Sequence, residues 1–473
     1  MSAQQESASA GRYVSQRDHR VFILLAALAA AILTQIVFAR TFGPLPGSAR
    51  DGWGVAIALF CLLTFSSGVV FMAVWLIRDT SIQWGVTASI AAAGVLMRLP
   101  YFGSGPLLED DHYRYLLDGA MSARGFSPYA LSPASLLYST PPALADLVEA
   151  GRSEIEAINF RDLRTIYPGF AQILFAVAHW IAPWKIDGLR LVIFVAEALT
   201  AVLIWRWLRV TRRTPSLVAL YWCNPLLAFC LTGQAHIDAA LAPPILFALS
   251  AAWRQRGLAA GLALGLAVGV KLWPVLLAPI LMRKLWPDRG QLIAFSLGLA
   301  IIVSIMCGAL LWASLSAKAG LTAYATGWSI NNAPFHWLSW LFVQTFGAGA
   351  GEMILRAAIV VAAVCASLYA GLLSSKGPDA LIARATILTA VLFYLSPAQF
   401  PWYAAWFIPL AVASGNWVLC SGALGLPVYF LFFPLITAGQ RDIFDYGVAA
   451  LHLVPLLAAV ALRHRLTEKG ANS

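Results

Sequence analysis

Apolar runs separated by short polar or basic segments dominate the sequence. A helix needs about 20 apolar residues to cross the hydrocarbon core of a bilayer, and several runs approach or exceed that length. The runs predict membrane helices near residues 22–39, 54–77, 82–99, 188–208, 215–232, 237–253, 257–270, 272–283, 290–312, 352–373, 382–397, 400–414, 417–437 and 444–462. The pattern therefore predicts an all-α, polytopic integral membrane protein with about 12–14 transmembrane helices.

The stretch 167–184 is also apolar, and the position of nearby arginines decides how it is interpreted. Arg206, Arg209, Arg212 and Arg213 follow one predicted span, and short cytoplasmic loops carry an excess of Lys and Arg. A full crossing by 167–184 would place this cluster outside the cell. We therefore expect a re-entrant or membrane-surface helix here, with both chain termini in the cytoplasm.

This topology predicts a single transmembrane domain, 22–462, between cytoplasmic tails at 1–21 and 463–473. The first apolar run is longer than the core of a signal peptide, so we expect an uncleaved first span. Two long segments, about 100–187 and about 313–351, should face outward. Polar and aromatic residues gather on that external face, whereas the cytoplasmic loops are short and basic. The expected location is the inner (plasma) membrane.

Composition supports the same class of protein. Of the 473 residues, 60% are hydrophobic and only 11% are charged, which is more apolar surface than a soluble protein of this size could bury. The net charge of +10 is explained by cytoplasmic loops and anionic lipid headgroups, so we expect no nucleic-acid partner. All six cysteines lie in apolar stretches without paired spacing, which predicts neither disulfides nor a metal site.

Three consecutive carboxylates, Glu109, Asp110 and Asp111, emerge directly from a predicted span. Carboxylates are costly beside a bilayer, so such a cluster is a candidate functional site. Residues 109–124 have helical spacing, and Arg114 could bridge Asp110 and Asp118 along one face. The dipole at the helix N-terminus should favour ionised Glu109 and Asp110. Simple charge complementarity with that dipole is the alternative, although three acids exceed what capping needs.

The order of short motifs resembles a known family. The run from Glu109 to Gly119 (EDDHYRYLLDG), followed by GFSPY, is similar to the first external loop of the GT-C superfamily of polytopic glycosyltransferases. The bacterial polyprenol-phosphate-mannose-dependent alpha-mannosyltransferases are the nearest group, and the GPI-anchor mannosyltransferases are more distant. Tyr167 lies in a segment similar to the family's Tyr-Pro-Pro motif, with Gly169 in place of the second Pro. Further matching segments are Cys223–Pro225, His236–Asp238, Lys271–Pro274 and Pro401–Tyr403.

The resemblance covers about residues 95–410 and implies a GT-C-like fold whose large first external loop bears membrane-surface helices. It implies inverting transfer of a hexose, with mannose as the expected sugar, from a polyprenyl-phosphate donor to a lipid or glycan acceptor. The transfer would take place on the external face, with Asp110 as general base. Asp111 is the second candidate for the base, or a helper. Mg²⁺ or Mn²⁺ could bind at Asp110 and Asp111, although a monophosphate leaving group does not require a metal.

Other candidate residues would hold the donor or the acceptor. Lys271 lies between two short apolar runs, where it could bind the donor phosphate or extend to lipid headgroups. Trp402 and Tyr403 suit either the interfacial belt or a sugar platform. The candidate substrate-binding residues are Glu109, Tyr113, Arg114, Asp118, Tyr167, His236, Asp238, Lys271, His336, Gln399, Trp402 and Tyr403.

Two other classes of function remain open at this point. A transporter or flippase for a lipid-linked sugar would use mid-membrane charges, and Glu197 is the plausible candidate, unless it simply pairs with a neighbouring helix. A non-catalytic membrane scaffold would leave the acidic cluster without a purpose. The partners expected for the enzyme are the lipid-linked donor, the acceptor and membrane lipids.

Overall fold

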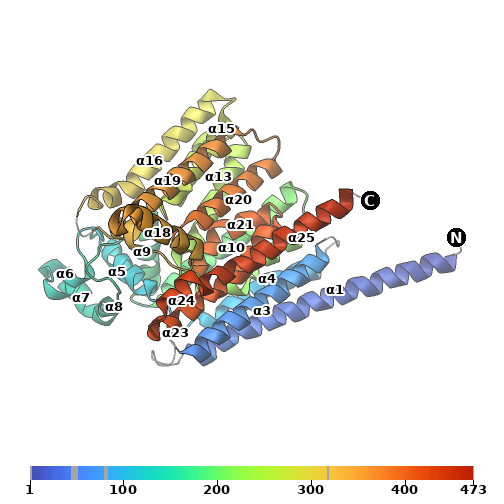
Figure 1. Cartoon of the computed structure of the whole chain (residues 1–473), viewed down its shortest axis with the longest axis horizontal. Helices are drawn as coiled ribbons and strands as arrows, with labels where there is room; N and C mark the ends of the chain where they lie inside the picture. The colour runs from blue at the N-terminus through green and yellow to red at the C-terminus, as the bar shows by residue number, and fades with distance from the viewer. Residues whose placement is uncertain (1–2, 44–51, 79–83, 317–318, 472–473) are drawn as a thin grey trace.

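The computed structural model describes residues 3–43, 52–78, 84–316 and 319–471. These residues form a bundle of helices, and the only β-type pairing among them is one isolated bridge between Ile330 and Ala398 (Figure 1). The α-helices are α1 (Ala3–Val37), α3 (Trp53–Ile77), α4 (Trp84–Arg98), α5 (Asp111–Ala123), α6 (Pro133–Tyr138), α7 (Ala145–Ala150), α8 (Arg152–Glu156), α9 (Gly169–Ile181), α10 (Ile186–Val210), α11 (Ala219–Trp222), α12 (Pro225–Ala228), α13 (Ala242–Trp253), α14 (Gly257–Val268), α15 (Ala278–Leu285), α16 (Arg289–Ala313), α17 (Gly320–Gly327), α18 (Ala333–Phe346), α19 (Ala348–Leu372), α20 (Pro378–Leu395), α21 (Ala404–Ala413), α22 (Trp417–Gly422), α23 (Phe432–Thr437), α24 (Arg441–Tyr446) and α25 (Val454–Ala471).

Short 3-10 and π segments join or interrupt these helices. They are η1 (Phe38–Phe42), η2 (Leu99–Tyr101), η3 (Pro142–Leu144), η4 (Pro215–Val218), η5 (Phe229–Gly233), η6 (Ile237–Ala240), η7 (Trp273–Leu277), η8 (Pro401–Tyr403), η9 (Ala423–Leu431) and η10 (Val448–Leu453). Several of them lie beside the candidate site, so the backbone there departs from regular helix.

Within the described ranges, eight helices are long and apolar enough to cross a membrane, or nine if one bent pair is a single span. The bent pair, Pro215–Trp222 and Pro225–Gly233, turns by 46° where Asn224 caps α12 and Pro225 begins it. Four shorter apolar helices occupy other predicted runs. The prediction of an all-α polytopic membrane protein is confirmed. Some of the 12–14 predicted spans are helices that are too short to cross a membrane on their own.

Helix α9 is one of these short apolar helices. Its 13 residues extend about 20 Å, which is less than the roughly 30 Å of a bilayer core. It packs against α5 and α10. Gly169 at its start replaces the family's second proline, and a Cβ there would lie 2.7 Å from the carbonyl oxygen of Met306. The close approach of α9 to α16 therefore requires glycine at this position.

Helices α5 to α8 form a cap at one end of the bundle, opposite the two chain termini (Figure 1). The cap has its own small apolar core, separate from that of the bundle. This core includes Leu117, Met121, Leu136, Leu147 and Ile155. The part of the predicted external segment from α5 to α8 therefore forms a packed unit, and the acidic cluster lies at its start.

The α5–α9 contact joins this cap to the bundle. The ring of Tyr115 stacks on Phe175, with centroids 4.6 Å apart, and a Cβ on Gly119 would lie 2.4 Å from the carbonyl oxygen of Phe175. The backbones can approach this closely only because residue 119 has no side chain. The carboxylates at the start of α5 depend on this contact for their position.

Glu197, the candidate mid-membrane acid, is paired inside the bundle. Its carboxylate forms an ion pair with Arg98 and accepts a hydrogen bond from the hydroxyl of Thr232, and both charged side chains are fully buried. Arg98 also donates to the carbonyl oxygens of Gly94 and Trp222, each at 2.8 Å. This arrangement supports the structural interpretation of Glu197.

We predict that Gly119→Ala lowers the thermal unfolding midpoint of the purified protein, because the new methyl group must displace the backbone of α9. Gly68→Ala is the matched control, since a Cβ there meets nothing within 4 Å and alanine favours a helix by about 1 kcal/mol. The control should unfold at or above the wild-type temperature. An unchanged midpoint for Gly119→Ala would contradict the α5–α9 contact described above.

Candidate active site

The site begins at the N-terminus of α5. Asp110 is the N-cap residue, but its side chain makes no capping hydrogen bond. Instead, its Oδ2 accepts a hydrogen bond from Nδ2 of Asn159, which lies in the cap. The interpretation that this acid only caps a helix is therefore not supported.

Asp111 faces the bundle. Its Oδ2 accepts a hydrogen bond from the hydroxyl of Tyr115 at 3.4 Å and lies 3.6 Å from Nδ1 of His236. The Asp111 side chain is 42% exposed, so it is accessible to a ligand, whereas that of His236 is fully buried. This contact unites the first predicted motif with the His236–Asp238 segment.

Lys271 and Asp238 lie next to this pair, and we call Asp111, His236, Asp238 and Lys271 together the polar centre. The Nζ of Lys271 lies 2.7 Å from Oδ1 of Asp238, which also accepts a hydrogen bond from the indole of Trp406 at 2.7 Å. The ammonium lies 4.0 Å from the centroid of the Tyr403 ring, a cation–π contact. Because Lys271 retains partial exposure and an ammonium has three donors, it can bind an anion while paired with Asp238.

Aromatic side chains wall this centre. His236 stacks on Trp402 with centroids 3.8 Å apart and an interplanar angle of 8°. The hydroxyls of Tyr403 and Tyr324 are 2.6 Å apart, and those of Tyr167 and Tyr115 are 3.2 Å apart. The predicted aromatic residues Tyr167, Trp402 and Tyr403 thus all border the site. These aromatic contacts fix the positions of Lys271 and Asp111.

Breaks in neighbouring helices bring these residues together. Lys271 follows the end of α14, where the carbonyl oxygen of Gly269 accepts a hydrogen bond from the amide of Ala171 in α9. His236 lies between η5 and η6, and the side chain of Gln234 accepts from the amide of Leu107, just before the acidic run. Non-helical backbone at these points therefore holds the motifs against α5 and α9.

Removal from bulk water changes the acidity of the carboxyl groups. Desolvation and the charge of Asp110 raise the pKa of Asp111 to about 7, against the opposing effect of Lys271. Desolvation also raises the pKa of Asp110. The pKa of Glu109 is raised well above its usual value by burial and by the charges of Asp111 and Asp110. The expectation that the helix dipole favours ionised Glu109 and Asp110 is wrong, because burial and like charge outweigh the dipole.

His236 is neutral in this environment. Burial lowers its pKa well below the usual value, and the charge of Lys271 lowers it further. Neither ring nitrogen has a hydrogen-bond partner among the described residues. A buried polar group without a partner is costly, so the imidazole is suited to bind a ligand atom.

Two predicted residues support the site from outside its centre. The carboxylate of Asp118 accepts hydrogen bonds from Thr165 and from Gln172, the latter at 3.0 Å. The expected bridge by Arg114 between Asp110 and Asp118 is wrong, because its Nη2 donates instead to the carbonyl oxygens of Phe160 and Leu163, at 3.4 and 3.1 Å. Arg114 thus holds the segment that contains Asn159.

Three further predicted residues lie outside the polar centre. Tyr113 packs on the cap core and on His112. Gln399 is buried, and its Nε2 donates to the carbonyl oxygen of Tyr394 at 3.0 Å. His336, in α18, lies 3.6 Å from Asp445 of α24. None of the three contacts the groups around Lys271 in the described structure.

Sequence reasoning missed Asn159, Tyr324, Trp406 and Tyr429. Trp406 lies inside an apolar run, where a tryptophan gives no sign of a polar contact. Tyr429, likewise in an apolar run, lies beside the carboxyl group of Glu109. Asn159 lies in a polar loop segment that gave no motif. No group of three or more His, Cys, Asp or Glu residues arranged for a metal ion occurs in the described part of the chain.

A scan against protein families matches residues 19–286 to the family described as alpha-(1->6)-mannopyranosyltransferase, N-terminal domain. A curated relative from Mycobacterium tuberculosis, alpha-(1->6)-mannopyranosyltransferase A, is 25% identical over 409 residues, which cover 79% of this chain and 75% of the relative. No solved structure matches the chain significantly. The family match includes Asp110, Asp111, His236, Asp238 and Lys271. The chain therefore belongs to the alpha-(1->6)-mannopyranosyltransferase family and is a GT-C-like membrane glycosyltransferase.

Proposed function

We propose that this enzyme transfers a mannosyl residue from a polyprenyl-phosphate donor to a lipid or glycan acceptor, with inversion and with Asp110 as general base. Family membership supports alpha-mannosyltransferase activity. The observation that carries the finer proposal is the convergence of Asp111, His236 and the Lys271–Asp238 pair beside Asp110. This centre combines a carboxylate base with groups that can hold one phosphate.

The donor phosphate binds beside Lys271 and His236. Lys271 supplies the positive charge that stabilises a departing phosphate, and neutral His236 can donate one ring N–H to a phosphate oxygen. A phosphate is a good leaving group, so no general acid is required. Trp402 and Tyr403 line the same side, where a sugar ring could pack on an aromatic face.

Asp110 removes the proton from the acceptor hydroxyl. The acceptor oxygen then attacks the anomeric carbon on the face opposite the phosphate, the bond from that carbon to the phosphate oxygen breaks, and the phosphate leaves with the electron pair. Inversion yields an α-linked product from a β-linked donor. The raised pKa of Asp110 strengthens it as a base. Asn159 holds one carboxylate oxygen and leaves the other available for the proton.

The external face is the proposed location of this reaction. Arg190, near the start of α10, donates to the carbonyl oxygens of Ser104 and Gly233, at 2.7 and 2.9 Å, at the end of the bundle that carries the site. The same helix ends at Val210, next to the basic segment that contains Arg212 and Arg213. Because basic loops favour the cytoplasm, the positive-inside rule supports an outward-facing site in the inner (plasma) membrane.

Incubation of the detergent-purified protein with a polyprenyl-phosphate mannose and a lipid acceptor should yield a mannosylated product that mass spectrometry detects. A nucleotide-linked mannose, supplied in place of the lipid-linked sugar, should give no product. A transporter or flippase moves its substrate without forming a glycosidic bond. It would therefore give no product in either reaction. Equal product from both donors would contradict the proposed donor class.

Asp110→Asn should lower kcat by about 10²–10⁴-fold, because the amide cannot accept the acceptor proton. Asp111→Asn should have a smaller effect, since it retains a polar group beside His236. Asp146→Asn, at an exposed position of the cap, is the charge-matched control and should keep wild-type activity. Circular dichroism and the unfolding midpoint should show that all three variants fold. A severe loss in Asp111→Asn with an active Asp110→Asn would assign the base to Asp111.

The pH profile should report the titration of Asp111. Because its pKa is about 7, the ionised fraction rises as pH increases through 7. The ionised carboxylate accepts a hydrogen bond from Tyr115 and faces His236, so we expect kcat/KM to fall as the pH is lowered through about 7. In Asp111→Asn this step near pH 7 should disappear. A step near pH 7 that persists unchanged in the variant would show that another group is responsible.

A further inference from the structure

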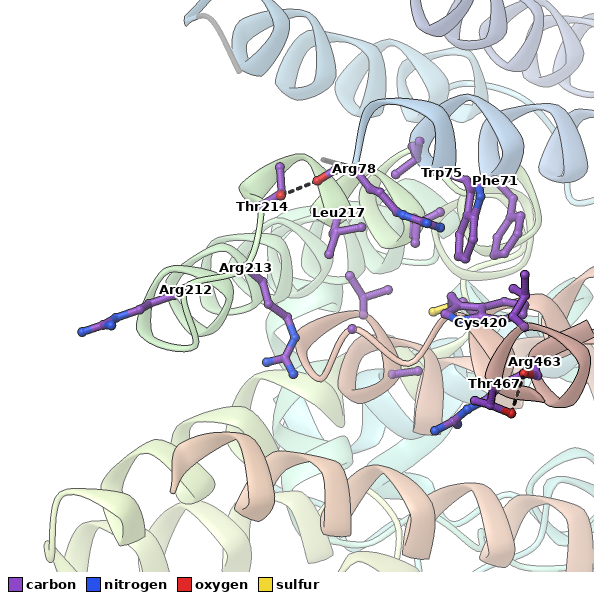
Figure 2. Close-up of a pocket in the computed structure, with 17 residues that line it drawn as sticks. Phe71, Trp75, Arg78, Arg212, Arg213, Thr214, Leu217, Cys420, Arg463 and Thr467 are labelled. Carbon is purple, nitrogen blue, oxygen red and sulfur yellow. Dashed lines mark hydrogen bonds between the residues drawn. The ribbon is translucent and has the colours of Figure 1, made fainter. Parts of the chain in front are cut away.

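A cavity lined by arginines lies away from the carboxylates. It has a volume of about 580 Å³ and is bordered by the end of α3, the segment between α10 and η4, the turn before α22, and α25 (Figure 2). Four arginines line it, Arg78, Arg212, Arg213 and Arg463, and no Asp or Glu lines it within the described ranges. The family match and the proposed reaction assign no role to this cavity.

The cavity lies at the opposite end of the bundle from the candidate active site. Helix α10 starts beside the site and has 25 residues, so its end is about 37 Å away. Arg212 and Arg213 follow that end directly. The positive-inside rule places these arginines on the cytoplasmic face, at the level of the lipid headgroups.

Close contacts order two of the arginines. The guanidinium of Arg78 lies 3.3 Å from the centroid of the Trp75 ring, and the carbonyl oxygen of Arg78 accepts a hydrogen bond from Thr214. Arg213 forms an ion pair with Asp379 and packs against Gly415, where φ is +68° and a Cβ would lie 2.7 Å from its Nε. Asp379 therefore offsets the charge of Arg213.

Arg463 makes no ion pair with any residue that the structure describes, and its helix position is exposed. Figure 2 shows Arg463 and Arg78 on opposite sides of the cavity, whereas Arg212 is directed away from it. The guanidinium group is a planar donor that matches the geometry of a phosphate. Arg463 thus presents to the cavity a positive charge in a form suited to a phosphate group.

Apolar and aromatic side chains form the remaining wall. Trp75 and Trp417 pack edge to face, with centroids 4.8 Å apart, and Phe71 and Leu217 also line the cavity. Tryptophan favours the level of the headgroups, and apolar residues beside it can accommodate the start of an acyl chain. A soluble anion would make no use of this apolar surface. We propose that the cavity binds the phosphate of an anionic phospholipid from the cytoplasmic leaflet.

The test uses the full chain purified in detergent, to which phosphatidylglycerol, phosphatidylcholine or inorganic phosphate is added. Native mass spectrometry measures the lipid retained, and thermal unfolding measures stabilisation. We expect phosphatidylglycerol to be retained preferentially and to raise the unfolding midpoint most. Arg463→Gln should weaken its apparent affinity by roughly tenfold, the effect of one charge-assisted hydrogen bond of about 1.5 kcal/mol.

Arg206→Gln is the matched control, because Arg206 is exposed on α10, carries the same charge and does not line the cavity. It should retain wild-type affinity, and the double variant Arg78→Gln/Arg463→Gln should bind less than either the control or Arg463→Gln alone. Equal retention of both lipids, or equal effects of Arg206→Gln and Arg463→Gln, would overturn the proposal. Stabilisation by inorganic phosphate equal to that by phosphatidylglycerol would show a site for a soluble anion and overturn the lipid assignment.

Discussion

Buried arginines donate hydrogen bonds to the unpaired backbone carbonyl oxygens of broken helices. These hydrogen bonds hold together the helices that carry the candidate site. A helix break leaves carbonyl oxygens unpaired, and inside an apolar bundle no water is available to bind them. Arg98 donates to the carbonyl oxygen of Trp222, beside the bend at Asn224, and fully buried Arg190 donates to that of Gly233. His236 follows that second break by three residues. The position of the imidazole therefore depends on a guanidinium that belongs to a different helix.

Both arginines are paired with acidic residues, which makes it possible to bury their charges inside the bundle. Glu197 neutralises Arg98, and Asp187 lies 3.0 Å from Arg190, so neither guanidinium is isolated. Burying a paired charge costs less than burying a single one. Their structural role also separates these charges from the proposed reaction, in which Lys271 holds the phosphate.

Hydrophobic patterning predicted the helices well, because burial in a bilayer or a bundle acts on every residue of a run. It could not predict which residues meet, and the association of Asp111, His236 and Lys271 came from motif order. Helical spacing gave a wrong prediction for a side chain that has a hydrogen-bond partner far away in the sequence. Arg114 has the correct spacing to reach Asp118, yet carbonyl oxygens 46 and 49 residues away in the chain take its guanidinium. The helix dipole likewise failed to predict the raised pKa of Asp110, since burial arises from distant segments.

The two adjacent aspartates gain different surroundings from their place between the cap and the bundle. Asp110 contacts Asn159 of the cap, whereas Asp111 contacts His236 of the bundle. Neighbouring residues at a helix start point in different directions, so one α-helix can serve both units. In the proposed reaction, the acceptor hydroxyl meets Asp110 on the side of the cap, and the lipid-linked donor meets the Lys271 group on the side of the bundle. The proposed division, with Asp110 on the acceptor side and Asp111 toward the donor phosphate, follows from this geometry.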